Sequence, residues 1–219
     1  MKICAISDTH GQHATLDGHM PDADVLIHAG DLTSMGKLAQ LAQLRDAAAW
    51  LDAQTERYEH VIAIAGNHDF IAEAFMTEDR EKEMREKLFP RVHYLRDSGV
   101  TLNGKYFYGS PWSPRFYDWA FNADRGLTIK QYWDKIPLYT NVLVTHGPPM
   151  GILDRVGYEH VGCKDLRDAT VFRLSLAAHI FGHIHCAHGQ AQIDGTQYIN
   201  ASVLNDAYRL AEWPTVIEI

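Results

Sequence analysis

The motif Gly66-Asn67-His68-Asp69 directly follows the apolar run 60–65 (HVIAIA). A continuous apolar run of this length is typical of a β-strand that is buried on both faces. The polar residues of the motif then fall at the carboxyl end of the strand, which is where open α/β sheets gather their ligands. This stretch therefore predicts an α/β fold with a functional site at a strand end.

Four other apolar runs end in the same way, in a short motif of polar residues or glycine. The runs are residues 2–7, 24–29, 141–145 and 178–181, and the motifs after them are Asp8-Thr9-His10, Gly30-Asp31, His146-Gly147 and Gly182-His183-Ile184-His185. Stretches with helical character lie between several runs, at residues 35–54, 71–88 and 163–176. Alternating strands and helices indicate an α/β fold.

The last third of the chain has a different pattern. Residues 189–193, 196–201 and 215–219 look like strands, and Asp194-Gly195 is typical of a hairpin turn. They predict a second, mostly antiparallel sheet packed on the first. A further hairpin is predicted at 99–109, turning at Asn103-Gly104, and the aromatic stretch 110–126 predicts a long loop or a short helical excursion. Because no repeat or linker interrupts the pattern, we predict one domain, residues 1–219.

Composition narrows the class of protein. The chain has 219 residues, of which 46% are hydrophobic and 22% charged, as in ordinary soluble globular proteins. Its net charge of −8 argues against binding to extended nucleic acid, which requires clustered Lys and Arg. The odd, sparse cysteines (Cys4, Cys163 and Cys186) indicate a reducing compartment. No apolar run approaches the ~20 residues of a membrane span and no signal peptide is recognisable, so we expect a cytoplasmic protein without a membrane partner.

The five strand-end motifs together offer carboxylates, imidazoles and one amide. These side chains belong to Asp8, His10, Asp31, Asn67, His146, His183 and His185. Such a set suits divalent metals of intermediate hardness. Each motif alone has an ordinary interpretation, such as a loop pair, a turn or a core histidine. Five in this order, each at a strand end, favour one shared metal site, where Gly30, Gly66 and Gly182 would permit tight turns beside the ions.

The spacing within two motifs leaves an alternative open. In Asp8-x-His10 and His183-x-His185, residues two apart in an extended chain point the same way. If the turn departs from extended geometry, the two members of a pair can instead serve adjacent ions.

The ordered series of motifs resembles the calcineurin-like metallophosphoesterase superfamily. Residues 109–121 (GSPWSPRFYDWAF), 145–154 (THGPPMGILD) and 198–203 (YINASV) are similar to its metallophosphoesterase-domain-containing (MPPED-like) subgroup. The resemblance implies a four-layer α-β-β-α sandwich of two mixed sheets flanked by helices. It also implies two metal ions, one held by Asp8, His10 and His185, the other by Asn67, His146 and His183, with Asp31 bridging both. We expect Mn²⁺ first, with Fe²⁺, Zn²⁺, Co²⁺ or Ni²⁺ as alternatives.

A phosphoesterase with two such ions has a definite mechanism. Two cations ~3.5–4 Å apart can share a water and lower its pKa toward neutrality, and the resulting hydroxide attacks phosphorus. The leaving alkoxide then needs a proton. The resemblance leaves His68 outside the ligand set, so we predict His68 as the general acid. Asp69 is predicted either to orient and charge His68 or to cap the helix predicted at 71–88, and it can do both.

The resemblance favours small phosphodiesters, including cyclic nucleotides, as substrates. Asn67 and His68 are expected to contact the substrate. The aromatic stretch is either a local core that pins a loop or a wall on which a nucleobase stacks, with Phe116 in the wall and Arg115 touching the phosphate or a ribose oxygen. One alternative is a phosphomonoesterase or protein phosphatase of the same superfamily, with Arg115, Arg125 and Arg155 as extra clamps. The other is a metal-binding interaction scaffold with little catalysis, against which the complete ligand set argues.

Overall fold

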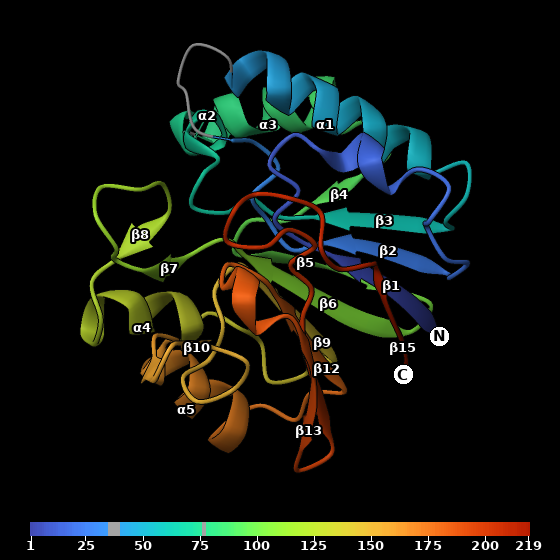
Figure 1. Cartoon of the computed structure of the whole chain (residues 1–219). Coiled ribbons are helices and arrows are strands. Elements are labelled where there is room, and N and C mark those ends of the chain that lie inside the picture. Colours follow the sequence, from blue (N-terminus) through green and yellow to red (C-terminus); the bar gives the residue numbers. More distant parts are fainter. Residues whose placement is uncertain (35–39, 76–77) are drawn as a thin grey trace.

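The computed structural model of the protein describes residues 1–34, 40–75 and 78–219. Two large sheets lie face to face, and helices cover the outer face of each (Figure 1). One outer layer holds α1 (Gln40–Gln54), α2 (Phe70–Ala74) and α3 (Glu78–Leu88), and the other holds α4 (Leu127–Trp133) and α5 (Lys164–Phe172). The predicted four-layer α-β-β-α sandwich is therefore confirmed.

The first sheet has the strand order β15-β1-β2-β3-β4. Its parallel strands are β1 (Lys2–Ile6), β2 (Val25–His28), β3 (His60–Ala63) and β4 (His93–Tyr94). The last strand of the chain, β15 (Thr215–Glu218), pairs antiparallel with β1. The two ends of the chain thus lie side by side (Figure 1).

The second sheet has the order β13-β14-β12-β9-β6-β5. Its parallel centre consists of β6 (Lys105–Ser110), β9 (Val142–Thr145), β12 (Ala178–Phe181) and β14 (Thr196–Asn200). The antiparallel edge strands β5 (Ser98–Leu102) and β13 (Gly189–Ile193) form the two predicted hairpins, with β6 and β14 respectively. Positive φ angles at Asn103, Gly104, Asp194 and Gly195 are those that such two-residue turns need.

The prediction of a mostly antiparallel C-terminal sheet is wrong. Strand β14 pairs parallel with β12 and antiparallel with β13, so that Tyr198 and Ile199 are buried between neighbouring strands. Strand β15 crosses to the first sheet, where it covers the open edge of β1 and adds Ile217 to the core between the sheets. Both sheets are therefore mixed.

The helix predictions needed correction at their ends. The start of the helix predicted at 35–54 includes residues 35–39, which lie outside the described residues, and α1 is observed from Gln40. The helix predicted at 71–88 includes residues 76–77, which lie outside the described residues; α2 ends at Ala74, where half-buried Phe75 leaves helical geometry and packs on the core, and α3 is observed from Glu78. The helix predicted at 163–176 ends at Phe172.

Smaller elements occupy the long connections. The aromatic stretch 110–126 contains the paired strands β7 (Ser113–Pro114) and β8 (Asn122–Ala123). A short hairpin joins β10 (Arg155–Val156) to β11 (Glu159–His160). Two 3₁₀ turns, η1 (His13–Leu16) and η2 (His185–Ala187), follow the carboxyl ends of β1 and β12.

Alternation along the buried strands divides the core. On β1, Ile3 and Ala5 point into the layer between the sheets, whereas Cys4 and Ile6 join the cluster beneath the helices. Helix α1 contributes Leu44 to that second cluster. Since both faces of the central strands are covered, a site for a ligand is expected at the ends of these strands.

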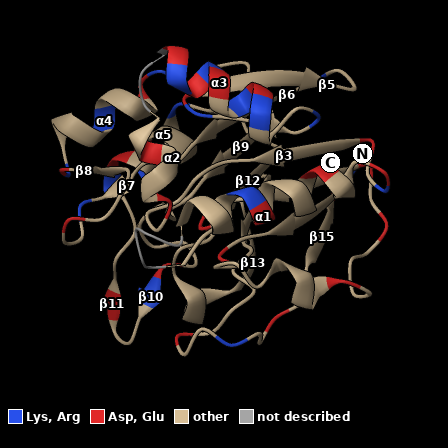
Figure 2. Cartoon of the chain, turned by 90° about the horizontal axis from the view of Figure 1, so that it is seen from above, with Lys and Arg blue, Asp and Glu red and all other residues tan. Residues whose placement is uncertain are grey.

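Charged side chains are interspersed rather than segregated on the most polar helix. Figure 2 shows both signs alternating along α3, where ion pairs four residues apart join Lys82 to Glu86 and Lys87 to Glu83. Such pairs support a helix whose only deeply buried anchor among its described side chains is Met84. Among the described helices, none has the length and apolarity that crossing a membrane requires.

Candidate metal centre

The carboxyl ends of strands from both sheets bring the predicted ligands to one place. Asp8 follows β1, Asp31 follows β2 and His146 follows β9. Their donor atoms all lie within 4.8 Å of one another, and the donor atoms of Asp8, His10 and His185 form a second group of that size. Residues 175 positions apart in the chain, His10 and His185, thus become neighbours.

Donor atoms within these groups have spacings that suit a shared cation. The Nε2 atoms of His10 and His185 are 3.3 Å apart, and His185 Nε2 is 3.5 Å from Asp8 Oδ1. Asp31 Oδ2 lies 3.7 Å from His10 Nε2 and 3.4 Å from His146 Nε2. Two ligands at about 2.0–2.2 Å from one ion are roughly 3–3.5 Å from each other. The donor set therefore fits divalent transition metals.

Backbone carbonyls orient three of the histidine rings through hydrogen bonds to Nδ1. In each of three rings, Nδ1 faces a backbone carbonyl at 3.1 Å: His10 faces Thr33, His146 faces Ala29 and His185 faces Asn205. Because a carbonyl oxygen only accepts, Nδ1 carries the proton, and Nε2 is left as a donor atom for a metal. This arrangement is typical of metal-binding histidines.

The two carboxylates are fixed in the same manner. Asp8 Oδ2 accepts the hydroxyl of Ser202 at 2.7 Å and the backbone N–H of His183 at 2.9 Å. Asp31 Oδ1 accepts the backbone N–H of His68 at 2.7 Å. Each carboxylate therefore keeps one oxygen facing the imidazoles while the other is held by the protein.

Electrostatics keeps both carboxylates ionised. Burial alone would raise the pKa of Asp31, but the imidazoles of His146 and His10 lower it well below its usual value. Burial likewise opposes protonation of His146 and His185, but Asp31 and Asp8 raise their pKa values to about 9. Metal ligands must be deprotonated, so a bound cation would replace these protons.

The backbone at the site is unusual. Asp8, His10, Asp31 and His183 all have positive φ, between 45° and 71°. Side-chain-bearing residues rarely adopt this conformation, and it persists where the surrounding structure enforces it. The turns are therefore not extended, although Asp8 and His10 still contribute to the same group.

Two glycines make room for the carboxylates. A Cβ atom added to Gly66 would collide with Asp31, and one added to Gly182 would collide with Asp8 and Ser7. The sequence-based expectation that glycines avoid crowding at the site is consistent with this geometry.

His68 lies beside the ligands with one nitrogen unengaged. Its Nε2 is 3.9 Å from Asp31 Oδ2, which places it in a third compact group with His10 and Asp31. Gln40 Nε2 donates to the His68 carbonyl at 2.8 Å and fixes the backbone. The buried Nδ1 has no hydrogen-bond partner among the described residues. Burial lowers the pKa of His68 to about 4.

Asp69 stands at the N-cap position of α2, but its carboxylate bonds elsewhere. Its carboxylate accepts the backbone N–H groups of Leu32, Thr33 and Gly66, at 2.8–3.1 Å, and the Thr33 hydroxyl. Within the described residues, none of its hydrogen bonds goes to the ring of His68, and its side chain makes no capping bond to α2. Burial raises its pKa to about 6. The capping prediction is therefore right in position but wrong in the side-chain bond, because the carboxylate points into the gap between two loops, and an influence of Asp69 on His68 stays a prediction.

The two remaining predicted ligands, Asn67 and His183, are neighbours of His146. Asn67 Oδ1 is 2.7 Å from His146 Nε2. The ring of His183 is centred 5.0 Å from that of His146, and its backbone N–H bonds to Asp8. Within the described part of the chain, no compact donor group includes His183.

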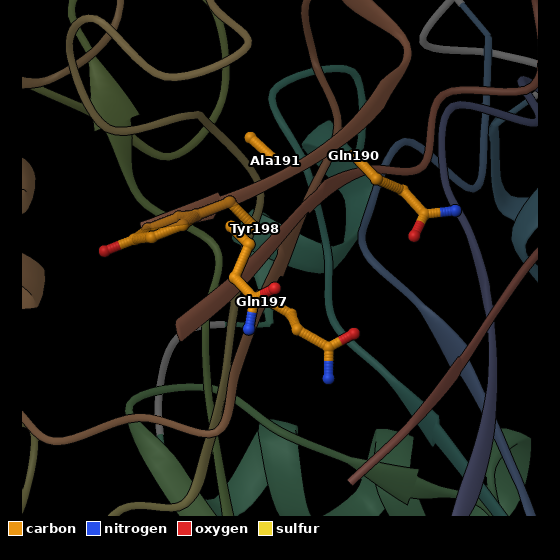
Figure 3. Close-up of a pocket in the computed structure, with 5 residues that line it drawn as sticks. Gln190, Ala191, Gln197 and Tyr198 are labelled. Carbon is orange, nitrogen blue, oxygen red and sulfur yellow. The ribbon is translucent and has the colours of Figure 1, made fainter. Parts of the chain in front are cut away.

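The predicted substrate residues Arg115 and Phe116 are not brought to this centre by any described contact. Arg115 Nε donates to Asp124 at 2.6 Å, and the Phe116 ring, 61% exposed, packs on Tyr117. A separate shallow hollow lies on β13 and β14, lined by Gln190, Ala191, Gln192, Gln197 and Tyr198 (Figure 3). Among these lining residues there is no predicted site residue and no ionisable group other than Tyr198.

Sequence reasoning missed residues that the structure adds to the site. Ser202 binds Asp8, and the ring of Tyr208 is centred 4.9 Å from that of His10. Trp119, which lies in the aromatic stretch 110–126, has its ring centred 4.2 Å from that of His68. Ser202 and Tyr208 follow β14, so the strand-end rule applied to residues 196–201 would have found this loop.

Comparison with known proteins agrees with the site. The sequence profile of the family described as Calcineurin-like phosphoesterase matches residues 1–187. The chain is 36% identical over 237 residues to Metallophosphoesterase domain-containing protein 1 of Homo sapiens, covering 100% of this chain and 71% of that protein. It is 35% identical over 232 residues to UPF0046 protein K07C11.7 of Caenorhabditis elegans, covering 100% and 75%.

A solved structure shares the fold. The protein TT1561 of Thermus thermophilus superposes with a TM-score of 0.60 at 14% identity, covering 91% of this chain and 88% of that one. Together with the donor groups, the family match supports a metal-dependent phosphoesterase. The chain belongs to the calcineurin-like phosphoesterase family, and its curated relatives are the metallophosphoesterase domain-containing and UPF0046 proteins.

Proposed function

We propose that the protein hydrolyses small phosphodiesters, cyclic nucleotides among them, with two divalent transition-metal ions. The observation that carries this proposal is the position of Asp31. Its Oδ2 atom lies 3.7 Å from His10 Nε2 and 3.4 Å from His146 Nε2, so one oxygen faces donors from both groups. A carboxylate in that position is suited to bridge two ions.

The proposed ligand allocation is the one that the family resemblance implies, and the compact group of Asp8, His10 and His185 supports its first half. Asp8, His10 and His185 would hold one ion, Asn67, His146 and His183 the other, and Asp31 both. Mixed imidazole and carboxylate ligands suit Mn²⁺, Fe²⁺, Co²⁺, Ni²⁺ or Zn²⁺, and we propose Mn²⁺ as the first candidate. When bound, the two cations activate a water and stabilise charge on the phosphoryl oxygens.

His68 is proposed to protonate the leaving oxygen. The ring is anchored through its backbone to Asp31 and Gln40, and its Nδ1 makes no bond to the described residues. The other ring nitrogen, Nε2, lies 3.9 Å from Asp31 Oδ2 and thus beside the donor groups, where a substrate oxygen would be held. Asn67, beside His68 in sequence, is proposed to contact the phosphate as well.

Two of the three predicted arginine clamps are engaged elsewhere, which favours diesters over monoesters. A monoester dianion needs more cationic partners than a diester monoanion. Arg115 is paired with Asp124, and Arg125 donates to the carbonyls of Val161 and Gly162. The contribution of Arg115 and Phe116 to substrate binding stays a prediction, as does the cytoplasmic location, which free Cys4, Cys163 and Cys186 support.

Metal analysis combined with a substrate panel tests the proposal. Protein loaded with Mn²⁺ and desalted should contain about two ions per chain. It should hydrolyse bis(p-nitrophenyl) phosphate faster than p-nitrophenyl phosphate. The variant Asp31→Asn serves as the control for contaminating phosphatases. A folded protein that binds none of the five metals, or that cleaves only the monoester, would contradict the proposal.

A further inference from the structure

Two aromatic side chains from distant parts of the chain lie against the histidines of the centre. Trp119, between β7 and β8, has its ring centred 4.2 Å from that of His68. Tyr208, between β14 and β15, lies 4.9 Å from His10 and 6.1 Å from His68, centre to centre. Both rings are thus neighbours of the imidazole proposed as proton donor.

The position of Tyr208 is built into its loop. Its φ of 55° is left-handed, and its backbone N–H donates to the Asn205 carbonyl at 2.8 Å. The same carbonyl faces Nδ1 of His185 at 3.1 Å, and the Tyr208 carbonyl accepts Gln12 Nε2 at 3.0 Å. A left-handed backbone conformation at a residue with a side chain persists only where surrounding contacts, such as these hydrogen bonds, hold it. The loop that orients a ligand histidine therefore also fixes the Tyr208 ring.

The two residues that follow Trp119 in the chain hold its backbone in place. The backbone N–H of Ala120 donates to the Asn67 carbonyl at 3.0 Å, and that of Phe121 donates to Glu73 at 2.7 Å. Ala120 and Phe121 are fully buried, whereas the Trp119 side chain is only half-buried. The ring is consequently held in place while part of its surface stays accessible.

We propose that Trp119 and Tyr208 form an aromatic subsite that binds the alcohol group of the phosphate ester. This inference rests on the proposed function, because it uses His68 as the group that meets the leaving oxygen. An alcohol attached to that oxygen lies alongside the rings that contact His68. Both side chains are uncharged at neutral pH, so the subsite selects a flat aromatic group, such as a benzyl ring or a nucleobase, over an aliphatic one.

The exposed rings nearby have no comparable position. Tyr117 is 74% exposed and packs on Phe116, and Trp213 is 51% exposed with its ring 4.1 Å from that of His19. Tyr117 shares the β7–β8 connection with Trp119, and Trp213 shares the β14–β15 connection with Tyr208. These two residues are therefore matched controls.

Binding by calorimetry to the Mn²⁺-loaded protein tests the subsite independently of turnover. Benzyl phosphate and cyclohexylmethyl phosphate differ only in whether the ring is flat and aromatic. We expect the benzyl ester to bind roughly tenfold to a hundredfold more tightly. Trp119→Ala and Tyr208→Ala should each reduce this ratio, because only the benzyl ester loses a stacking partner in addition to apolar contact. Tyr117→Ala and Trp213→Ala should keep the full ratio. Thymidine 5′-phosphate against 2-deoxyribose 5-phosphate repeats the comparison for a nucleobase.

Equal affinity for the benzyl and cyclohexylmethyl esters would overturn the inference. The inference would also be overturned if the affinity ratio of the two esters stayed the same in both alanine variants. A preference seen only between thymidine 5′-phosphate and 2-deoxyribose 5-phosphate would overturn it as well. If an alanine variant fails to fold, Trp119→Leu and Tyr208→Leu replace it, since they retain volume but not the aromatic face. Hydrolysis of bis(p-nitrophenyl) phosphate by the same samples tests the proposed function separately. If the protein hydrolyses this diester but binds both ring types equally, only the aromatic subsite is contradicted. If it binds the benzyl ester more tightly but hydrolyses no diester, only the proposed function is contradicted.

Discussion

The Thr33 hydroxyl donates to the Asp69 carboxylate at 2.8 Å, and the Thr33 backbone N–H donates to the same oxygen at 2.9 Å. The second oxygen of Asp69 accepts the N–H of Gly66 at 2.8 Å. One carboxylate therefore joins the loop after β2, which carries Asp31, to the loop after β3, which carries His68. Asp69 thus helps to fix the relative position of these two side chains, together with the direct bond from the His68 N–H to Asp31 Oδ1.

Replacing Asp69 by Asn should weaken this connection. The amide offers one acceptor oxygen instead of two, so at least one buried N–H loses its partner. We expect Asp69→Asn to lower the free energy of unfolding by about 1–3 kcal/mol. Denaturant unfolding measures it, with Asp194→Asn in the exposed hairpin turn as a control that should not change. Equal stability of the two variants would show that Asp69 is not a structural connector.

The bridging position of Asp31 predicts the severest loss among the ligands. Asp31→Asn removes a charged partner from both ions, whereas His185→Asn affects one. Turnover of bis(p-nitrophenyl) phosphate at saturating metal should therefore fall further in Asp31→Asn than in His185→Asn. The fall should exceed the roughly 10–100-fold effect of losing an outer hydrogen-bond partner of a ligand. Near-normal turnover in Asp31→Asn would exclude the bridging role.

A general acid and a metal ligand give different results at His68. If His68 protonates the leaving oxygen, His68→Ala should leave metal content intact. It should slow hydrolysis of alkyl esters by roughly 10²–10⁴-fold and of aryl esters less, because a good leaving group needs less protonation. Elemental analysis and kcat for matched methyl and p-nitrophenyl diesters measure both effects. Loss of an ion, or equal losses on both esters, would make His68 a ligand, as its proximity to Asp31 allows.

The hydrogen bond from Ser202 to Asp8 predicts a role in metal retention. Ser202→Ala leaves one Asp8 oxygen without its hydroxyl partner at 2.7 Å. Outer partners of this kind typically contribute roughly 10–100-fold to metal affinity, so we expect a loss of that size. Competition with a chelator measures the affinity, and Ser98→Ala, on the edge strand β5, should have no effect. Unchanged metal affinity in Ser202→Ala would contradict the prediction.

The local pattern of apolar and turn residues in the sequence was sufficient to predict several features of the fold. The runs at 60–65 and 178–181 predicted β3 and β12, because strands buried on both faces need continuous apolar sequence. Asn103-Gly104 and Asp194-Gly195 predicted hairpins, because these turns require residues that tolerate positive φ. The strand-end rule then named Asp8, Asp31 and His146, which the fold does bring together.

Only the tertiary structure decided which strands and loops meet. Strand β15 joins β1 rather than its sequence neighbour β14, and Ser202 reaches Asp8 across 194 residues. Asp69 bonds to Thr33 instead of the adjacent His68. Such contacts depend on sheet register and on how two sheets are layered, whereas sequence pattern reports only the burial and turn preference of each segment. The amino-acid sequence alone therefore determined the elements and the types of ligand, and packing between distant segments decided their partners.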